Sequence, residues 1–235
     1  MANAENSFSF SRSGDAGASG KRQIAAFDFD GTLTVRDSLV PFLRRVAGGA
    51  GLARACVAEV RALYRDMKGG QREEGKEGVL QRVFRGESVA GVEELAVSFA
   101  EERRDLLRPQ MLRRVEWHRA QEHELIIISA SLHVYLEHVA RVLGFDHVIA
   151  VELETENGLY TGHMRGPNVR AQEKANRLLA WLDGAEAEIW AYGDSRGDKE
   201  LLELADHALF VGSARQHEKI GFATANVQQV GKHDL

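Results

Sequence analysis

The sequence is nearly free of cysteine, because Cys56 is the only one among its 235 residues. A single cysteine excludes an internal disulfide framework and is typical of a reducing compartment. Long apolar runs are also missing: the longest purely aliphatic stretch covers residues 125–128, whereas a membrane-spanning helix needs about 20 residues. Residues 1–20 lack the apolar segment of a signal peptide. We therefore expect a cytoplasmic protein without a membrane span.

No charge of one sign dominates the chain. The 30 basic and 35 acidic residues give a formal net charge of -5. General binding to nucleic acid needs a basic surface, so this balance predicts no nucleic-acid partner. Hydrophobic residues make up 44% of the chain, which is ordinary for a globular protein with a sizeable core. We expect a monomer or a homodimer.

Short apolar runs separated by amphipathic helical patterns predict an α/β fold with a Rossmann-like, mostly parallel sheet. The strand candidates are residues 23–28, 125–129, 189–192 and 208–211. Two further apolar runs flank Asn157-Gly158, which predicts a β-hairpin. From about residue 35 to residue 124 no strand candidate occurs, and apolar residues recur at spacings of three and four. This stretch predicts an α-helical cap domain inserted after the first strand.

These patterns divide the chain into four parts. We expect a disordered tail over residues 1–20, because this segment has too little apolar content to fold alone. Residues 21–36 and 116–213 form the predicted α/β core, and residues 37–115 form the predicted cap. Residues 214–235 are expected to be a C-terminal tail.

Polar residues follow three predicted strands at the points where those strands end. Asp28 and Asp30 follow the first strand, Ser129 ends the second, and Asp194 and Asp198 follow a later one. The carboxyl ends of parallel strands meet at one edge of the sheet, where open α/β proteins bind ligands. Four carboxylates at one edge repel each other unless a cation joins them, and all-oxygen ligation suits Mg²⁺. The sequence therefore predicts a magnesium site that can receive a phosphate group.

Each of these segments has a plainer interpretation when it is taken alone. An Asp-Gly pair after a strand is usually a turn, and a serine such as Ser129 often caps a strand end. The acids of residues 193–198 could simply favour a helix N-terminus. The placement of all three segments at successive strand ends favours a common site.

Four segments in chain order resemble the motifs of the haloacid dehalogenase (HAD) superfamily. They are Asp-Phe-Asp-Gly-Thr at 28–32, Ile-Ser-Ala-Ser at 128–131, Lys174, and Gly-Asp-Ser-Arg-Gly-Asp at 193–198. The helical insertion resembles the cap of the phosphoserine-phosphatase-like branch, subfamily IB, and the resemblance covers about residues 24–212. It implies a HAD-like core and a Mg²⁺-dependent phosphatase that hydrolyses a small phosphorylated metabolite through an aspartyl-phosphate.

The resemblance also implies catalytic and metal-binding roles. Asp28 would be the nucleophile, Asp30 the general acid and base, and Lys174 the cation that balances negative charge. The metal ligands would be the Asp28 side chain, the Asp30 backbone carbonyl and Asp194. Asp198 would not contact the metal directly but would orient the water bound to it.

Phosphate and substrate contacts would come from Ser129, Ala130, Gly31 and Asp37. Asp37 occupies the position of an acid that contacts the substrate amine in the phosphoserine-phosphatase-like branch. In the same comparison Leu80 stands where that branch has a carboxylate-binding arginine. The sequence therefore predicts that another ester, such as an alcohol or amino-alcohol phosphate, is a better substrate than phosphoserine. If the cap is misaligned, the alternative carboxylate-binding residues are Lys76 and Arg82.

Two other functions stay open at this level. A phosphotransferase or mutase would use the same residues and pass the phosphoryl group to an acceptor other than water. A non-catalytic phosphate-binding module would keep only the fold. The presence of all four acids favours an enzyme, because a binding module has no need of an acid and base at Asp30.

Overall fold

The computed structural model describes residues 20–61, 64, 74–102 and 106–232. The predicted disordered tail therefore lies almost entirely outside the described residues. A six-stranded parallel sheet has the order β3-β2-β1-β6-β7-β8. Its strands are β1 (Arg22–Phe27), β2 (Glu124–Leu132), β3 (His147–Val151), β6 (Ala187–Gly193), β7 (His207–Val211) and β8 (Val227–Val230).

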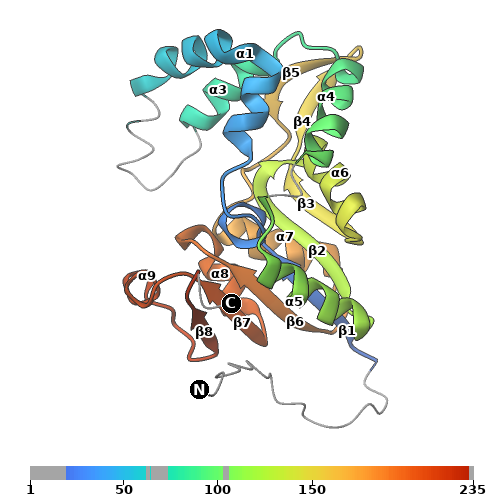
Figure 1. Ribbon diagram of the computed structural model, residues 1–235, viewed down its shortest axis with the longest axis vertical. Helices are drawn as coiled ribbons and strands as arrows, with labels where there is room; N and C mark the ends of the chain where they lie inside the picture. The colour runs from blue at the N-terminus through green and yellow to red at the C-terminus, as the bar shows by residue number, and fades with distance from the viewer. Residues whose placement is uncertain (1–19, 62–63, 65–73, 103–105, 233–235) are drawn as a thin grey trace, which may run out of the picture.

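The centre of the sheet is the apolar strand β1, which pairs with β2 on one side and β6 on the other. Its residues 24–27 are fully buried, and the Phe27 ring stacks on Tyr192 of β6 with centroids 4.3 Å apart. Helices cover both faces of the sheet (Figure 1). They are α5 (Pro109–Ala120) and α6 (His133–Leu143), and α7 (Gln172–Leu182) and α8 (Lys199–Leu204). The predicted α/β class with a parallel core sheet is confirmed.

The C-terminal segment corrects one sequence-based prediction. Residues after 213 are not a tail, because α9 (Ala214–Ile220) and β8 extend the core. Strand β8 pairs in parallel with β7, and its Val227 and Val230 side chains are buried. The strand is only four residues long and has polar glutamines at its centre, so its apolar signal in the sequence is weak.

The cap lies above the carboxyl ends of the core strands (Figure 1). It contains α1 (Leu39–Ala58), α3 (Glu74–Phe84) and α4 (Val89–Glu101), and α1 is kinked at Gly48, which has φ of +68°. Phe42 of α1 lies at the centre of an aromatic cluster, with ring centroids 5.1 Å from Phe99 and 4.7 Å from Tyr135 of α6. These contacts fasten the cap to the core helix α6.

The predicted hairpin is present, but it belongs with the cap. It is formed by β4 (Leu153–Glu156) and β5 (Leu159–Met164) in antiparallel pairing. Gly86 N donates to Tyr160 O, and Tyr160 N donates to Glu87 O, so the hairpin is hydrogen-bonded to the end of α3. Gly162 packs so closely on α3 that an added Cβ would lie 2.6 Å from Gln81 Cα. The sequence predicts one strand over residues 148–154. In the structure, Glu152 separates β3 of the sheet from β4 of the hairpin.

Two neighbouring segments connect the cap to the core. Val35 N donates to Leu106 O, and Arg108 N donates to Leu33 O, so the outgoing and returning chains run antiparallel side by side. Helix α5 follows the second connection and packs on β2. The predicted cap boundary at residue 115 is therefore too late, because the chain has already returned to the core at Arg108.

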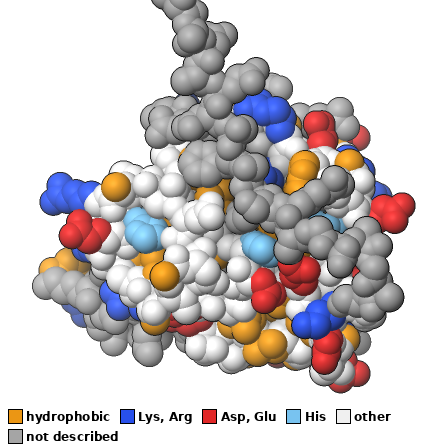
Figure 2. Space-filling model, turned by 90° about the horizontal axis from the view of Figure 1, so that it is seen from below, with side chains coloured by type: hydrophobic (Ala, Val, Ile, Leu, Met, Phe, Trp, Pro, Cys, Tyr) orange, Lys and Arg blue, Asp and Glu red, His pale blue; other side chains and the backbone are white. Residues whose placement is uncertain are grey.

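Within the described part of the chain, no helix has the length and apolar character that a bilayer crossing requires. Figure 2 views the molecule from below, and on this face acidic and basic side chains are scattered without a continuous basic surface among the described residues.

Candidate active site

The candidate site lies where β1, β2 and β6 end. The chain leaves β1 at Asp28 and turns sharply through η1 (Phe29–Leu33). Gly31 has φ of +88° in this turn, a conformation that favours glycine. A Cβ on Gly31 would lie 2.3 Å from Asp194 Oδ2. The glycine thus lets the turn after β1 approach the loop after β6.

This approach brings three predicted acids together. Carboxylate oxygens of Asp28, Asp194 and Asp198 lie within 4.8 Å of one another. The buried Lys174 of α7 bridges two of them, with Nζ 2.6 Å from Asp28 Oδ1 and 2.5 Å from Asp198 Oδ1. Thr32 Oγ1 donates to the other oxygen of Asp28 over 3.0 Å. Lys174 therefore contacts two of the predicted site acids, as its predicted role of balancing negative charge requires.

Burial and crowding set the ionisation of this cluster. Burial, and then repulsion from Asp198, raise the pKa of Asp28 well above its ordinary value, although Lys174 lowers it. Burial also raises the pKa of Asp194. Burial alone would lower the pKa of Lys174, but Asp198 and Asp28 raise it above its usual value. The crowding of three carboxyl groups therefore disfavours their joint ionisation unless further positive charge is present.

The donor set fits a divalent cation with oxygen ligands. Asp28 and Asp194 can each direct an oxygen to a common point, and Mg²⁺ favours such carboxylate ligands. Asp198 Oδ2 accepts hydrogen bonds from the Asp194 and Ser195 amides and from Ser195 Oγ. Asp198 thus holds the loop that presents Asp194, while its other oxygen is bound by Lys174.

Asp30 lies two residues from Asp28 but has different partners. Its Oδ1 accepts from Ser38 N at 2.8 Å, and its Oδ2 accepts from Ser131 Oγ at 2.5 Å. Ser38 Oγ in turn hydrogen-bonds to the buried Tyr135 hydroxyl at 2.8 Å. Burial raises the pKa of Asp30 to about 6, although the hydrogen bonds from Ser131 and Ser38 lower it. This carboxyl group can exchange a proton near neutral pH.

With the exception of Gly31, which packs against Asp194, the predicted site residues line a cavity of about 640 Å³. Ser129 and Ala130 line it at the end of β2, and Ser129 Oγ accepts from Ser131 N, so its hydroxyl hydrogen is available to a ligand. Asp37 also lines the cavity, but it is exposed at the cap side, and its Oδ1 accepts from Val40 N. The structure brings Asp37 to the cavity without joining it to the acid cluster.

Several contributing residues were missed by sequence reasoning. Lys232, in the supposed tail, reaches Asp194 Oδ2 with its Nζ at 2.7 Å. The buried Arg108 donates to the carbonyl oxygens of Gly31 and Lys232 at 3.3 and 3.2 Å. Ser131 had a signal, because it lies in the quoted Ile-Ser-Ala-Ser motif. Lys232 and Arg108 lie outside every motif and had none.

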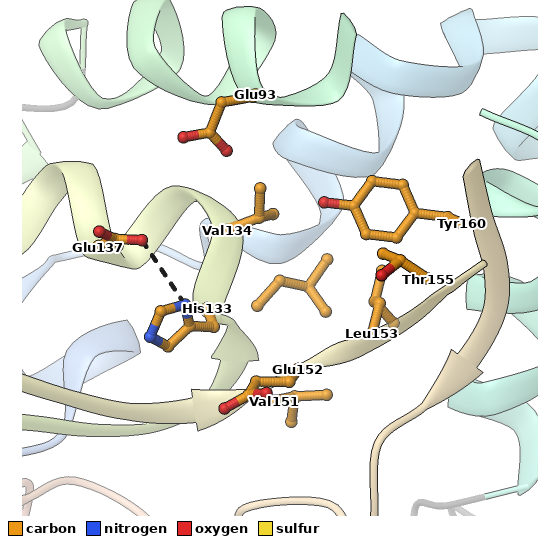
Figure 3. A pocket seen from close by; sticks show the side chains of 10 residues that line it. Glu93, His133, Val134, Glu137, Val151, Glu152, Leu153, Thr155 and Tyr160 are labelled. Atoms are coloured by element: carbon orange, nitrogen blue, oxygen red, sulfur yellow. Dashed lines mark ion pairs between the residues drawn. The ribbon is translucent and has the colours of Figure 1, made fainter. Parts of the chain in front are cut away.

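A second cavity, of about 280 Å³, lies between α4, α6 and the hairpin. Figure 3 shows the Tyr160 side chain directed into it, with Glu93 of α4 above and the His133–Glu137 pair at one side. None of the predicted catalytic residues lines this cavity. The chemistry predicted from the sequence therefore belongs to the larger cavity.

Comparisons with known proteins agree with this geometry. The family model of haloacid dehalogenase-like hydrolases matches residues 25–203. Protein CicA of Caulobacter vibrioides is 35% identical over 188 residues, which cover 78% of this chain and 83% of that protein. The chain belongs to the haloacid dehalogenase-like hydrolase family.

Solved structures share the fold. A protein of unknown function from Bordetella pertussis Tohama I has a TM-score of 0.73 and 25% identity, covering 89% of this chain and 98% of that chain. A probable phosphoserine phosphatase from Vibrio cholerae has a TM-score of 0.60 and 18% identity, covering 88% of this chain and 60% of that chain. The architecture is therefore that of phosphoserine-phosphatase-like HAD proteins.

Proposed function

We propose that the protein is a Mg²⁺-dependent phosphomonoesterase that transfers a phosphoryl group from a small phosphorylated metabolite to Asp28 and then hydrolyses the aspartyl-phosphate. One observation carries this proposal: Asp28 and Asp30 are separated by only one residue, but their carboxyl groups have different surroundings. Asp28 faces Lys174 and the acid cluster, whereas Asp30 is held by the neutral donors Ser38 and Ser131. Two carboxyl groups with different surroundings can divide the roles of nucleophile and acid–base.

The nucleophile must be ionised and directed at phosphorus. Lys174 and Thr32 each hold one oxygen of Asp28 through a hydrogen bond, which fixes the orientation of the carboxylate. Asp28 and Asp194, with the Asp30 backbone carbonyl, would hold Mg²⁺, which when bound supplies the positive charge that phosphoryl transfer needs. Ser129 and the Ala130 amide would bind phosphoryl oxygens at the end of β2.

Asp30 would move the proton in both half-reactions. Its protonated form donates to the leaving alkoxide as the bond from phosphorus to oxygen breaks. The resulting carboxylate then accepts a proton from the water that attacks the aspartyl-phosphate. Ser38 and Ser131 keep the carboxyl group in place during both steps.

The test is phosphate release from p-nitrophenyl phosphate and from a panel of phosphorylated metabolites. We expect activity with Mg²⁺, loss of activity in EDTA, and recovery when Mg²⁺ is restored. Asp28→Asn should abolish turnover, because an amide is a poor nucleophile of similar shape. The matched control is Asp183→Asn, an exposed position at the end of α7 with φ of +48°, which asparagine tolerates. Multiple turnover by Asp28→Asn, or full activity in EDTA, would refute the proposal.

A further inference from the structure

The shape of the catalytic cavity bears on the leaving group, if the proposed phosphatase function is accepted. The cavity volume of about 640 Å³ lies within the range of roughly 300–1,000 Å³ that is usual for pockets holding drug-sized ligands. The acid cluster and Lys174 occupy the core end, where the phosphoryl group would lie. The cap end is therefore left for the group to which the phosphate is esterified.

The cap end of this cavity is apolar. The lining residues on α1 and α3 are Leu39, Val40, Cys56, Lys76 and Val79, and four of these five side chains carry no charge or strong polar group. Val40 is 57% exposed although it lines the cavity. A ligand that covers this wall would gain the free energy of removing apolar surface from water.

Two charged residues line the cavity at its cap side, Asp37 and Lys76, and Asp37 Oδ1 accepts from Val40 N. Lys76 Nζ donates to Ala130 O and to Asn168 Oδ1, each over 2.6 Å. Arg82, the other basic candidate on α3, pairs with Glu59 at 2.7 Å, and Leu80 is fully buried. The two hydrogen bonds of Lys76 leave at most one of its N–H groups for the carboxylate of an amino-acid leaving group, whereas an apolar group needs none.

We propose that the preferred substrate is a phosphate monoester of an uncharged, apolar alcohol, whose alkyl or aryl part packs on Leu39, Val40, Cys56 and Val79. This inference rests on the proposed phosphatase function and names its leaving group. The reaction is the same: the bond from phosphorus to the leaving oxygen breaks, Asp30 protonates that oxygen, and the alcohol departs.

The experiment compares kcat/KM for methyl, butyl and hexyl phosphate with that for O-phosphoserine. Full burial of one methylene corresponds to about fourfold in kcat/KM and half burial to about twofold. The five additional methylenes of hexyl phosphate should therefore raise kcat/KM over that of methyl phosphate by about thirtyfold or more. A flat or falling series, or a higher value for O-phosphoserine than for hexyl phosphate, would overturn the inference.

A pair of variants on α1 locates the effect. Val40→Asn places a polar group in the apolar wall, whereas Val57→Asn makes the same change on the same helix at a residue that is 73% exposed and does not line the cavity. We expect the ratio of hexyl to methyl kcat/KM to fall at least fivefold in Val40→Asn and to stay within twofold in Val57→Asn. An unchanged ratio in Val40→Asn would reject this wall as the binding surface.

The panel separates two kinds of failure. Turnover of the esters without a chain-length preference would reject the apolar leaving group and leave the phosphatase intact. Absence of turnover for every ester, including p-nitrophenyl phosphate, would reject the proposed function itself and the inference with it.

Discussion

Asp28 and Asp30 share no hydrogen-bond partner, although only one residue separates them. The turn at Asp30 and Gly31 has non-helical backbone angles: Asp30 has ψ of 116° and Gly31 has φ of +88°. The Asp30 carboxyl group therefore faces Ser38 at the start of the cap and Ser131 after β2, while Asp28 faces Lys174. In the proposed mechanism, this local backbone feature separates the acid that receives the phosphoryl group from the acid that handles the proton.

This division predicts a selective effect of Asp30→Asn. An alkyl phosphate needs a proton on its leaving oxygen, so its rate should fall by about 10²- to 10⁴-fold. The p-nitrophenolate group leaves without that proton, so Asp28 should still be phosphorylated. Rapid mixing should then show a burst of one p-nitrophenol per enzyme followed by slow turnover, because the base for the second step is missing. Wild-type steady-state rates in this variant would require another acid and base.

Lys232 predicts a change in metal affinity. Its ammonium lies 2.7 Å from Asp194 Oδ2, where it opposes the approach of a cation to the same carboxylate. Lys232→Met should lower the dissociation constant for Mg²⁺ by about three- to tenfold. The measurement is calorimetric titration with Mg²⁺.

The control for this measurement is Lys219→Met, an exposed lysine of α9 in the same C-terminal segment. The same loss of charge at Lys219 should leave the dissociation constant nearly unchanged. Weaker Mg²⁺ binding in Lys232→Met would mean that Lys232 helps to form the site.

At the scale of single elements, β8 predicts that the C-terminal segment contributes to stability. The Val230 side chain of the edge strand β8 is 2% exposed, so Val230→Ala removes buried methyl groups. The free energy of unfolding should fall by about 1–3 kcal/mol, whereas Val57→Ala at an exposed site should change it by less than about 0.5 kcal/mol. Urea unfolding measures the change in both variants. Equally small changes would mean that the C-terminal segment does not contribute to stability and behaves as a tail.

The elements that could be predicted are those with a strong local pattern. The buried runs around Ile24 and Ile126 and the Asn157-Gly158 turn are such patterns, and the strands and the hairpin are present. The attachment of that hairpin to the end of α3 could not be predicted, because it depends on backbone hydrogen bonds between Tyr160 and the residues Gly86 and Glu87, which carry no side-chain signal. Strand β8 was missed because a short edge strand needs few apolar residues.

The same distinction applies to the candidate site. Asp28, Asp194 and Asp198 could be placed together because they follow strand ends of one sheet, and the structure brings their carboxylate oxygens within 4.8 Å of one another. Lys174 depended on family resemblance, since an isolated lysine in a helix is usually exposed. Lys232 could not be predicted, because its contact with Asp194 is long-range and depends on the fold of the C-terminal segment.

At the scale of the whole molecule, His118 predicts a stability that depends on pH. This side chain is fully buried between α5 and β6, where Nε2 hydrogen-bonds to the Tyr192 hydroxyl at 2.7 Å and Nδ1 to His123 at 2.8 Å. Burial lowers the pKa of His118 to about 2, and the positive charge of His123 and Arg114 adds to this effect. The folded protein therefore keeps His118 neutral, while the unfolded chain binds a proton below about pH 6.5.

The sign of the dependence follows from these two states. The contribution of His118 is fully present above pH 6.5 and is lost as the pH falls below it, by up to about 1.4 kcal/mol for each pH unit. Urea unfolding at pH 7.5, 6.0 and 5.0 should show a steeper loss in the wild type than in His118→Gln. His163→Gln, at an exposed position of β5, is the control and should keep the wild-type slope. Parallel slopes in all three proteins would contradict the assignment.

The paired connections between cap and core have a mechanical consequence. Two antiparallel segments joined by the Val35–Leu106 and Arg108–Leu33 hydrogen bonds form a flat ribbon. Such a ribbon resists shear along its length, because sliding one segment past the other would break both hydrogen bonds. Together with the Phe42–Tyr135 ring contact and the hydrogen bond from Lys76 to Ala130 O, this ribbon holds Val40 and Val79 at a fixed place on the cavity that Asp28 also lines. In the proposed reaction, repeated turnover would therefore keep a constant register between the leaving group and Asp28.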